Sequence, residues 1–102
     1  MSENTLLSRL EGLQLRFEEV GLLITDPAVI GGMKRFVKLT KEYRDLEKIS
    51  KATLRYKQVL GTIEEARAIL ETENDAEMKE MAKEELDNCN STLPALEEEI
   101  KL

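Results

Sequence analysis

Histidine and tryptophan are absent from this 102-residue sequence, and Cys89 is its single cysteine. Without histidine, the chain cannot assemble a Ser-His-Asp or Cys-His nucleophilic site, nor the Glu-x-x-His motifs of di-iron helical bundles. One cysteine excludes a disulfide within the chain and is compatible with a cytosolic protein. The sequence therefore predicts no catalytic residue, no metal site and no bound cofactor, and we expect that the protein is not an enzyme.

Aromatic residues and long apolar runs are scarce as well. Aromatic residues make up 4% of the chain, whereas charged residues make up 35%. No stretch approaches the roughly 18 consecutive apolar residues of a membrane span, and no signal-peptide pattern opens the sequence. A composition rich in Leu, Glu, Lys and Ala is typical of exposed, coiled-coil-like helices. We expect one cytoplasmic helical domain that spans residues 1–102.

The longest predicted helix covers residues 33–70 and contains no proline. Its apolar residues recur in steps of three and four, the spacing of one helix face, in two series: Phe36, Leu39, Tyr43 and Leu46, then Ile49, Ala52, Tyr56, Val59, Ile63, Ala66 and Leu70. Such a helix would be roughly 55 Å long. Because the step of three from Leu46 to Ile49 follows another step of three, the heptad loses one residue there. We therefore predict strain or a small break near Lys48–Lys51.

A shorter helix precedes this long one and begins near Ser2 to Thr5. Its apolar stripe consists of Leu6, Leu10, Leu13, Phe17, Val20 and Ile24, and the pattern places Arg16 on the solvent side. The helix ends at Thr25-Asp26-Pro27, because proline disfavours the α conformation in the residue before it. Aspartate followed by proline then starts a short turn, which Gly31-Gly32 interrupts.

The last predicted helix follows a polar turn at Glu71–Asp75. Its stripe consists of Met78, Ala82, Leu86, Cys89, Leu93, Leu96 and Ile100. Pro94 removes a backbone hydrogen bond within this stripe, so we predict one bent helix with a kink near Asn90–Leu93. Together the stripes predict an all-α fold, an elongated antiparallel three-helix bundle in which a shorter N-terminal helix packs on a long helical hairpin.

The charged residues are distributed unevenly. Residues 34–57 carry nine basic and three acidic side chains, whereas residues 58–102 carry four basic and thirteen acidic ones. The basic residues of the long helix recur in steps of three and four, and we call this set the basic stripe: Lys34, Lys38, Lys41, Arg44, Lys48, Lys51 and Arg55. The stripe is a candidate site for rRNA phosphates or a partner of the acidic last helix. The second interpretation is favoured because the complementary charge lies in the same chain.

The remaining candidate residues are expected to be structural. Cys89 lies on an apolar stripe and is expected to be a small buried hydrophobic residue. Met78 and Met81 would suit an adaptable binding surface, but their position favours the core. Tyr43 and Tyr56 fit the core with a polar tip. Neighbouring glutamates point to different helix faces and are expected to be solvated: Glu64, Glu65, Glu84, Glu85, Glu97, Glu98 and Glu99.

Several segments resemble the N-terminal helical domain of the bacterial peptide chain release factor 1 family. One is Phe17-Glu18-Glu19-Val20 with Leu23 and the Thr25-Asp26-Pro27 break. Another comprises Arg35-Phe36, Leu39, Lys41-Glu42-Tyr43 and Leu46. The most specific is residues 75–86, DAEMKEMAKEEL, which is similar to the family's acidic, methionine-containing helix. The resemblance extends from about Leu6 to Leu102.

The resemblance implies a translation termination factor that directs stop-codon-dependent release of the nascent peptide. The family's Gly-Gly-Gln and Pro-x-Thr tripeptides are missing here, so the chain resembles only the binding domain of a longer factor. The implied partners are the ribosome, through the stalk base protein and its rRNA, and the release-factor-recycling GTPase, with no membrane and no small-molecule substrate. The alternative is a structural coiled-coil or adaptor protein that dimerises through its helical hairpin.

Overall fold

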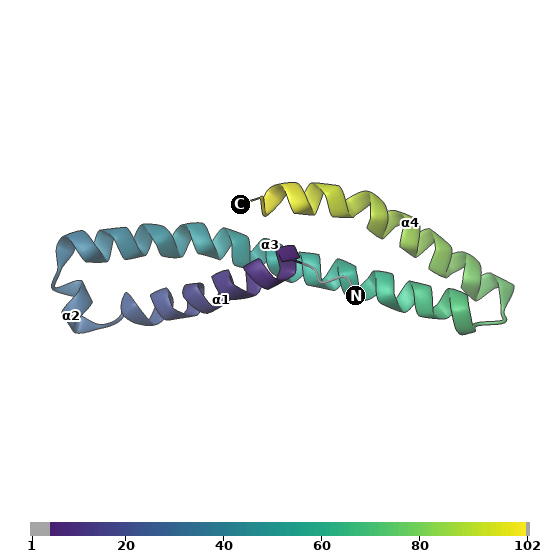
Figure 1. Ribbon diagram of the computed structural model, residues 1–102, viewed down its shortest axis with the longest axis horizontal. Helices are drawn as coiled ribbons and strands as arrows, with labels where there is room; N and C mark the ends of the chain where they lie inside the picture. Colours follow the sequence, from purple (N-terminus) through teal and green to yellow (C-terminus); the bar gives the residue numbers. More distant parts are fainter. Residues whose placement is uncertain (1–4, 102) are drawn as a thin grey trace. The chain divides into compact units, whose positions relative to one another are not determined.

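The computed structural model describes residues 5–101, and all regular secondary structure among them is helical (Figure 1). The helices are α1 (Thr5–Leu23), α2 (Pro27–Ile30), α3 (Met33–Thr72) and α4 (Ala76–Glu99). The chain forms two compact units, residues 1–51 and residues 52–102, and α3 contributes to both. The predicted all-α class is confirmed.

In the first unit, α1 runs antiparallel to the first half of α3, and α2 joins them (Figure 1). The buried core consists of Val20, Val29, Leu39 and Leu46, surrounded by the partly buried residues Leu13, Phe17, Leu23, Ile24, Phe36 and Tyr43. The rings of Phe17 and Tyr43 stack with their centroids 4.8 Å apart. The apolar stripe of α1 therefore packs on α3, as its spacing predicts.

The connection between α1 and α3 has the predicted capping chemistry. Asp26 has extended backbone dihedrals, and its Oδ1 accepts a 2.9 Å hydrogen bond from the Ala28 backbone N–H. Pro27 is the first residue of α2, where its missing N–H leaves no intrahelical bond unmade. The Gly31 N–H donates to the Pro27 carbonyl at 3.0 Å and closes the short helix. The described part of α1 begins at Thr5, and the other predicted start positions lie outside the described residues.

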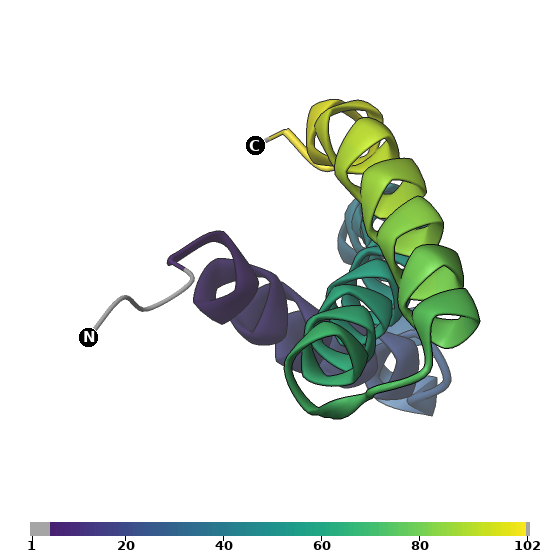
Figure 2. The same ribbon diagram turned by 90° about the vertical axis from the view of Figure 1, so that its right-hand side faces the viewer.

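In the second unit, the second half of α3 and α4 form an antiparallel hairpin, whose connecting loop faces the viewer in Figure 2. Asp75 caps α4, because its Oδ1 accepts a 2.9 Å hydrogen bond from the Glu77 N–H. This cap confirms the predicted polar turn. The buried apolar residues come from both helices and from the C-cap of α4, Ile100; those within the helices are Ala52, Tyr56, Ile63, Ala66, Ala82, Cys89 and Leu96.

Of the two alternatives near Lys48–Lys51, the small break is wrong, because α3 is one continuous helix from Met33 to Thr72, and strain there stays a prediction. The apolar pattern changes phase close to the boundary between the two units at Lys51 and Ala52. The first apolar series lies in the unit that contains α1, and the second series, from Ala52 onward, lies in the unit that contains α4. The two series face different partner helices, so they do not need to share one register. A continuous helix can therefore carry both of them without a break.

Helix α4 continues through Pro94 and ends at Glu99, which confirms one helix rather than two. Its ribbon is bowed in Figure 1. The exact position of the predicted kink, near Asn90–Leu93, stays a prediction. In the part of the chain that the structure describes, no helix has the combination of length and apolar content that a membrane span requires.

Candidate functional site

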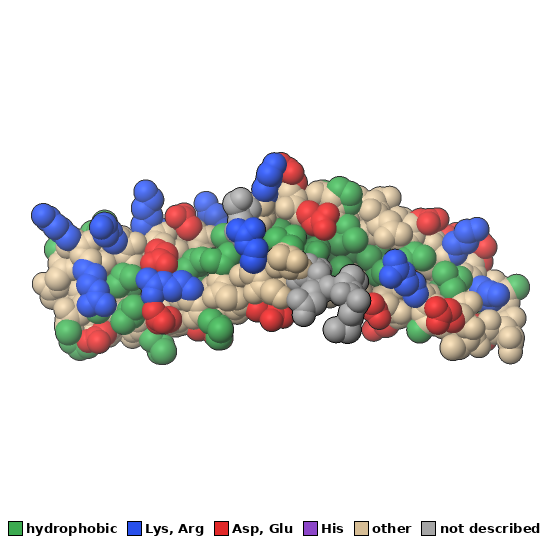
Figure 3. All heavy atoms as spheres, viewed as in Figure 1, with side chains coloured by type: hydrophobic (Ala, Val, Ile, Leu, Met, Phe, Trp, Pro, Cys, Tyr) green, Lys and Arg blue, Asp and Glu red, His purple; other side chains and the backbone are tan. Residues whose placement is uncertain are grey.

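The basic stripe lies along α3, and all seven of its side chains are exposed. Six of them belong to the first unit: Lys34, Lys38, Lys41, Arg44, Lys48 and Lys51. Figure 3 shows Lys and Arg side chains along the edge that the first half of α3 forms. An α-helix rises 1.5 Å per residue, so these six cations extend over roughly 26 Å.

Arg55 is the stripe residue that pairs with the acidic last helix. Its Nη2 lies 2.5 Å from Oε2 of Glu99 on α4, and about half of each side chain is exposed. The other six residues have no ion pair with any residue in the range 5–101. The structure therefore provides an acidic-helix partner for Arg55 and leaves the other six residues of the basic stripe without an ion pair among the described residues.

A groove of about 820 Å³ lies along α3, and three residues of the basic stripe help to line it. Its lining combines apolar, polar and charged side chains: Phe36, Val37, Thr40, Lys41, Arg44, Asp45, Glu47 and Lys48. Three of the charged residues are basic and two are acidic. The site can hold an anion through ammonium and guanidinium donors, and Phe36 and Val37 provide an apolar surface beside them.

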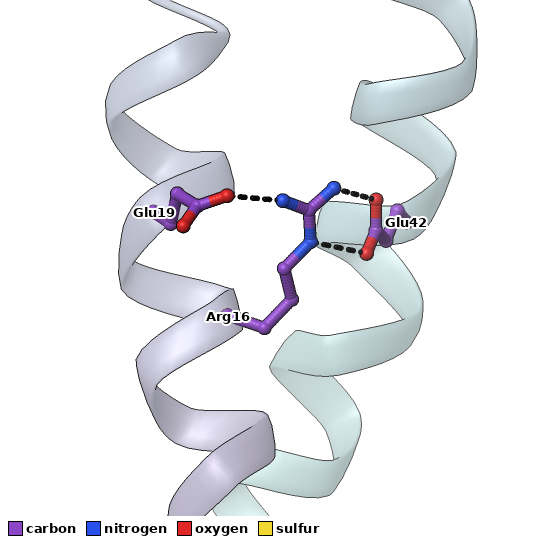
Figure 4. A network of polar contacts seen from close by, with 3 residues as sticks. All are labelled: Arg16, Glu19 and Glu42. Carbon is purple, nitrogen blue, oxygen red and sulfur yellow. Dashed lines mark hydrogen bonds and ion pairs between the residues drawn. The ribbon is translucent and has the colours of Figure 1, made fainter.

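Arg16 fixes the position of a third carboxylate near this site (Figure 4). Its Nε and Nη2 donate to the two oxygens of Glu42 at 2.7 and 2.9 Å, and its Nη1 donates to Glu19. The hydrogen bond from Arg16, aided by its positive charge, lowers the pKa of Glu42, and the same bond raises the pKa of Arg16. Because Glu42 is held by α1, its charge is matched without any cation of the basic stripe.

Two interhelical contacts were not evident from the sequence. The pattern placed Arg16 on the solvent side, but it is half-buried between α1 and α3. Similarly, the Ser50 hydroxyl donates a 2.6 Å hydrogen bond to Oε1 of Gln14. Both contacts depend on the register of α1 against α3, which apolar periodicity alone does not determine.

The structural roles of the other candidates are mostly confirmed. Cys89 is 8% exposed, and burial raises its pKa, so the thiol is a buried hydrophobic group. Tyr56 is buried, and the half-buried Tyr43 packs on the core of the first unit. The neighbouring glutamates of α3 and α4 are exposed. No group of three or more Cys, Asp or Glu side chains within residues 5–101 is arranged to hold a metal ion.

The prediction that Met78 and Met81 lie in the core is wrong. Met78 is 45% exposed and Met81 is 66% exposed. The buried residues of α4 are Ala82, Cys89 and Leu96, which follow a step of seven, and the two methionines lie beside this line. Small side chains therefore provide the close packing near the start of α4, and the large ones remain at the surface.

Comparisons with protein families and with known proteins identify the family of the chain and several relatives. The model of the PCRF domain matches residues 13–102. The chain belongs to the PCRF domain family. A peptide chain release factor 1 from Parabacteroides distasonis is 70% identical over 102 residues, and one from Bacteroides thetaiotaomicron is 62% identical over 103 residues. Each alignment covers the whole chain. No solved structure matches the chain.

More distant relatives carry the same name. The peptide chain release factor 1 of Enterococcus faecalis is 43% identical over 94 residues, which is 92% of this chain and 26% of that protein. The chain spans 28% of the length of the Parabacteroides distasonis and Bacteroides thetaiotaomicron relatives. The resemblance inferred from residues 75–86 and the preceding segments is therefore confirmed for the domain.

Proposed function

We propose that this PCRF domain is a binding and positioning module of a translation termination factor. The support is its membership of the PCRF family together with relatives that are named peptide chain release factor 1. In the complete factor, the domain would bind near the ribosomal stalk base while other domains read the stop codon and direct peptide release. It would also transmit the action of the recycling GTPase, and it would perform no chemistry of its own.

The observation that supports a nucleic-acid contact is the row of six exposed cations on the first half of α3. Within residues 5–101 none of the six forms an ion pair, and the neighbouring carboxylate Glu42 is already bound by Arg16. A row of free ammonium and guanidinium groups matches the regularly spaced charges of a phosphate backbone. We therefore propose that these six residues contact rRNA phosphates.

The ion pair between Arg55 and Glu99 favours the second interpretation for one end of the stripe. Arg55 belongs to the same unit as α4, and its guanidinium is already paired there. An exposed pair of this kind contributes under about 1 kcal/mol to folding. We therefore propose that Arg55 pairs within the hairpin of the second unit and that the other six stripe residues contact rRNA phosphates of the ribosome.

Charge reversal in the complete factor tests this assignment. The variant K38E/K41E/K48E is compared with K57E/R67E/K83E, which reverses three exposed charges outside the basic stripe. We expect the stripe variant to bind ribosomes at least tenfold more weakly and with a smaller salt dependence, because several phosphate contacts are lost. The control variant should stay within about twofold of the parent. Equal losses of ribosome affinity in both variants would contradict a specific contact. If the stripe variant is less stable but binds ribosomes with unchanged affinity, the stripe is instead a partner of the acidic last helix within the chain.

A further inference from the structure

A second groove lies in the hairpin of the second unit, between the end of α3 and the start of α4. It has a volume of about 340 Å³ and is lined by four residues of each helix: Thr62, Glu65, Ala66 and Ile69, and Met78, Met81, Ala82 and Glu85. Ala66 and Ala82 are both buried and are the small residues of this lining. We call this site the methionine groove. Its small floor residues leave room for side chains that project from a partner.

The walls of the methionine groove are apolar and adaptable. Met78 and Met81 are both exposed large hydrophobic residues, and Ile69 beside them is half-buried. Methionine has three rotatable side-chain bonds and a polarisable sulfur, so it can fit partners of different shape. A surface that gathers such residues around a hollow is typical of sites that receive apolar side chains.

Charge around the methionine groove has one sign. Among the described lining residues, the charged ones are Glu65 from α3 and Glu85 from α4, so each helix supplies one carboxylate. The lysines of the same part of α4, Lys79 and Lys83, line a different hollow, together with Glu80. The charged side chains that line the methionine groove are therefore both carboxylates, and a partner that enters it meets negative charge on both sides.

We infer that the methionine groove binds an amphipathic, basic helix of a partner protein. Two antiparallel helices leave a groove that a third helix can fill, which completes a three-helix bundle. Apolar side chains of that helix would lie over Ala66 and Ala82 between the methionines, while flanking Lys or Arg side chains reach Glu65 and Glu85. The inference rests on the proposed binding role of the domain and names the class of partner that this hairpin recognises.

A titration with a synthetic helix tests the inference. The probe is an 18-residue peptide with leucines in steps of three and four along one face and lysines on both flanks of that face. The 102-residue chain is labelled with 13C at its methionine methyl groups, and methyl spectra are recorded during the titration. We expect the Met78 and Met81 signals to shift with saturation in the micromolar range, while the exposed Met33 of the first unit does not shift. A control peptide with glutamates in place of the lysines should bind at least tenfold more weakly.

Matched variants test the role of the carboxylates. The variant E65Q/E85Q removes the two charges that line the groove, whereas E64Q/E84Q removes their sequence neighbours, which do not line it. We expect the first variant to bind the lysine peptide about three- to tenfold more weakly and the second to bind within twofold of the parent. Equal effects in both variants, or equal shifts at Met33, would overturn the inference.

Two further outcomes separate this inference from its alternatives. If the Met78 and Met81 signals shift with protein concentration alone while the molar mass doubles, the occupant is a second copy of the chain and the inference is wrong. Ribosome binding by the complete factor is measured separately with K38E/K41E/K48E. If the peptide does not bind while K38E/K41E/K48E weakens ribosome binding as expected, the inference about the methionine groove is wrong and the proposed function stands. If the lysine peptide binds as expected but the complete factor shows no affinity for ribosomes, the proposed function is wrong instead.

Discussion

Arg16 links the two helices of the first unit through a carboxylate as well as through the apolar core. Its guanidinium makes two hydrogen bonds to Glu42 on α3 and a third to Glu19 on its own helix. Two parallel N–H···O bonds fix the direction as well as the distance of approach. The pair therefore holds α1 in one register against α3. Packing of aliphatic side chains is less directional and determines this register less specifically.

The pair between Arg16 and Glu42 gives the stability of the domain a defined pH dependence. The pKa of Glu42 is lowered from its ordinary value of 4.5 in the folded state, so the unfolded state binds more protons in this range. The stabilisation is fully present above pH 4.5 and is lost as the pH falls through the folded pKa. We expect E42Q to be less stable than the parent at neutral pH and equal to it in acid. Chemical denaturation across this range measures the difference, and the control is E18Q, which removes an exposed charge of α1.

The glycines within the helices differ in what a methyl group would contact. A Cβ at Gly12 or at Gly61 would meet no other group within 4 Å, whereas a Cβ at Gly21 would lie 3.3 Å from Cε1 of Tyr43. We expect G12A and G61A each to raise the free energy of unfolding by about 0.5–1 kcal/mol, because alanine has less freedom to lose on folding. G21A should be at least about 0.5 kcal/mol less stable than either, because the Tyr43 ring must move. Equal stability of all three variants would show that α1 and α3 do not approach closely at Gly21.

The helices themselves were predictable from local signals. Apolar residues in steps of three and four located α1, α3 and α4, and Asp26 and Asp75 were recognised as part of the breaks that they cap. What the spacing could not determine is which partner each stripe meets. The phase change after Leu46 predicts strain or a small break, but α3 is continuous there and passes from one unit to the other.

The packing of α1 on α3 can be tested at Phe17. This ring stacks on Tyr43 and is half-buried, so it loses less on truncation than a fully buried phenylalanine would. We expect F17A to lower the free energy of unfolding by about 2–3 kcal/mol. On the same helix, Leu15 is 70% exposed, and L15A should cost less than about 0.5 kcal/mol. A loss below about 1 kcal/mol for F17A would mean that α1 does not pack on α3 at this level.

Met78 and Met81 show where a correct helical pattern gives a wrong environment. Met78 is the first residue of the stripe of α4, and Met81 follows it by three residues, so this position near the start of the stripe favours the core. In the folded hairpin, Ala66 and Ala82 are buried, and the methionines remain exposed beside them. Helical periodicity identifies the side of α4 that faces α3, but the sizes of the opposing side chains decide which residues are covered.

Across the whole molecule, charge is divided between the two units. The first half of α3 presents cations, and the hairpin of the second unit presents carboxylates along its methionine groove. The sequence alone revealed this asymmetry and favoured neutralisation within the chain. It could not show that six of the cations belong to a different unit from α4, with Arg55 alone beside Glu99.

The most informative sequence feature was instead the family resemblance of residues 75–86, which no physical pattern would have identified.

The molecule as a whole should act only by binding, which leads to our last prediction. The 102-residue sequence contains no histidine, and its Gly31-Gly32 pair is followed by methionine rather than glutamine. Without a histidine to activate a nucleophile, and without the tripeptide to which release is attributed in this family, the chain alone should release no peptide from a ribosome stopped at a stop codon. A complete factor that lacks the equivalent of residues 1–102 should retain codon-dependent release at saturating concentration. Its deficit should appear as weaker binding or a poorer response to the recycling GTPase. Quantifying released peptide against a no-factor control checks both expectations, and release by the chain alone above that control would overturn its assignment as a binding domain.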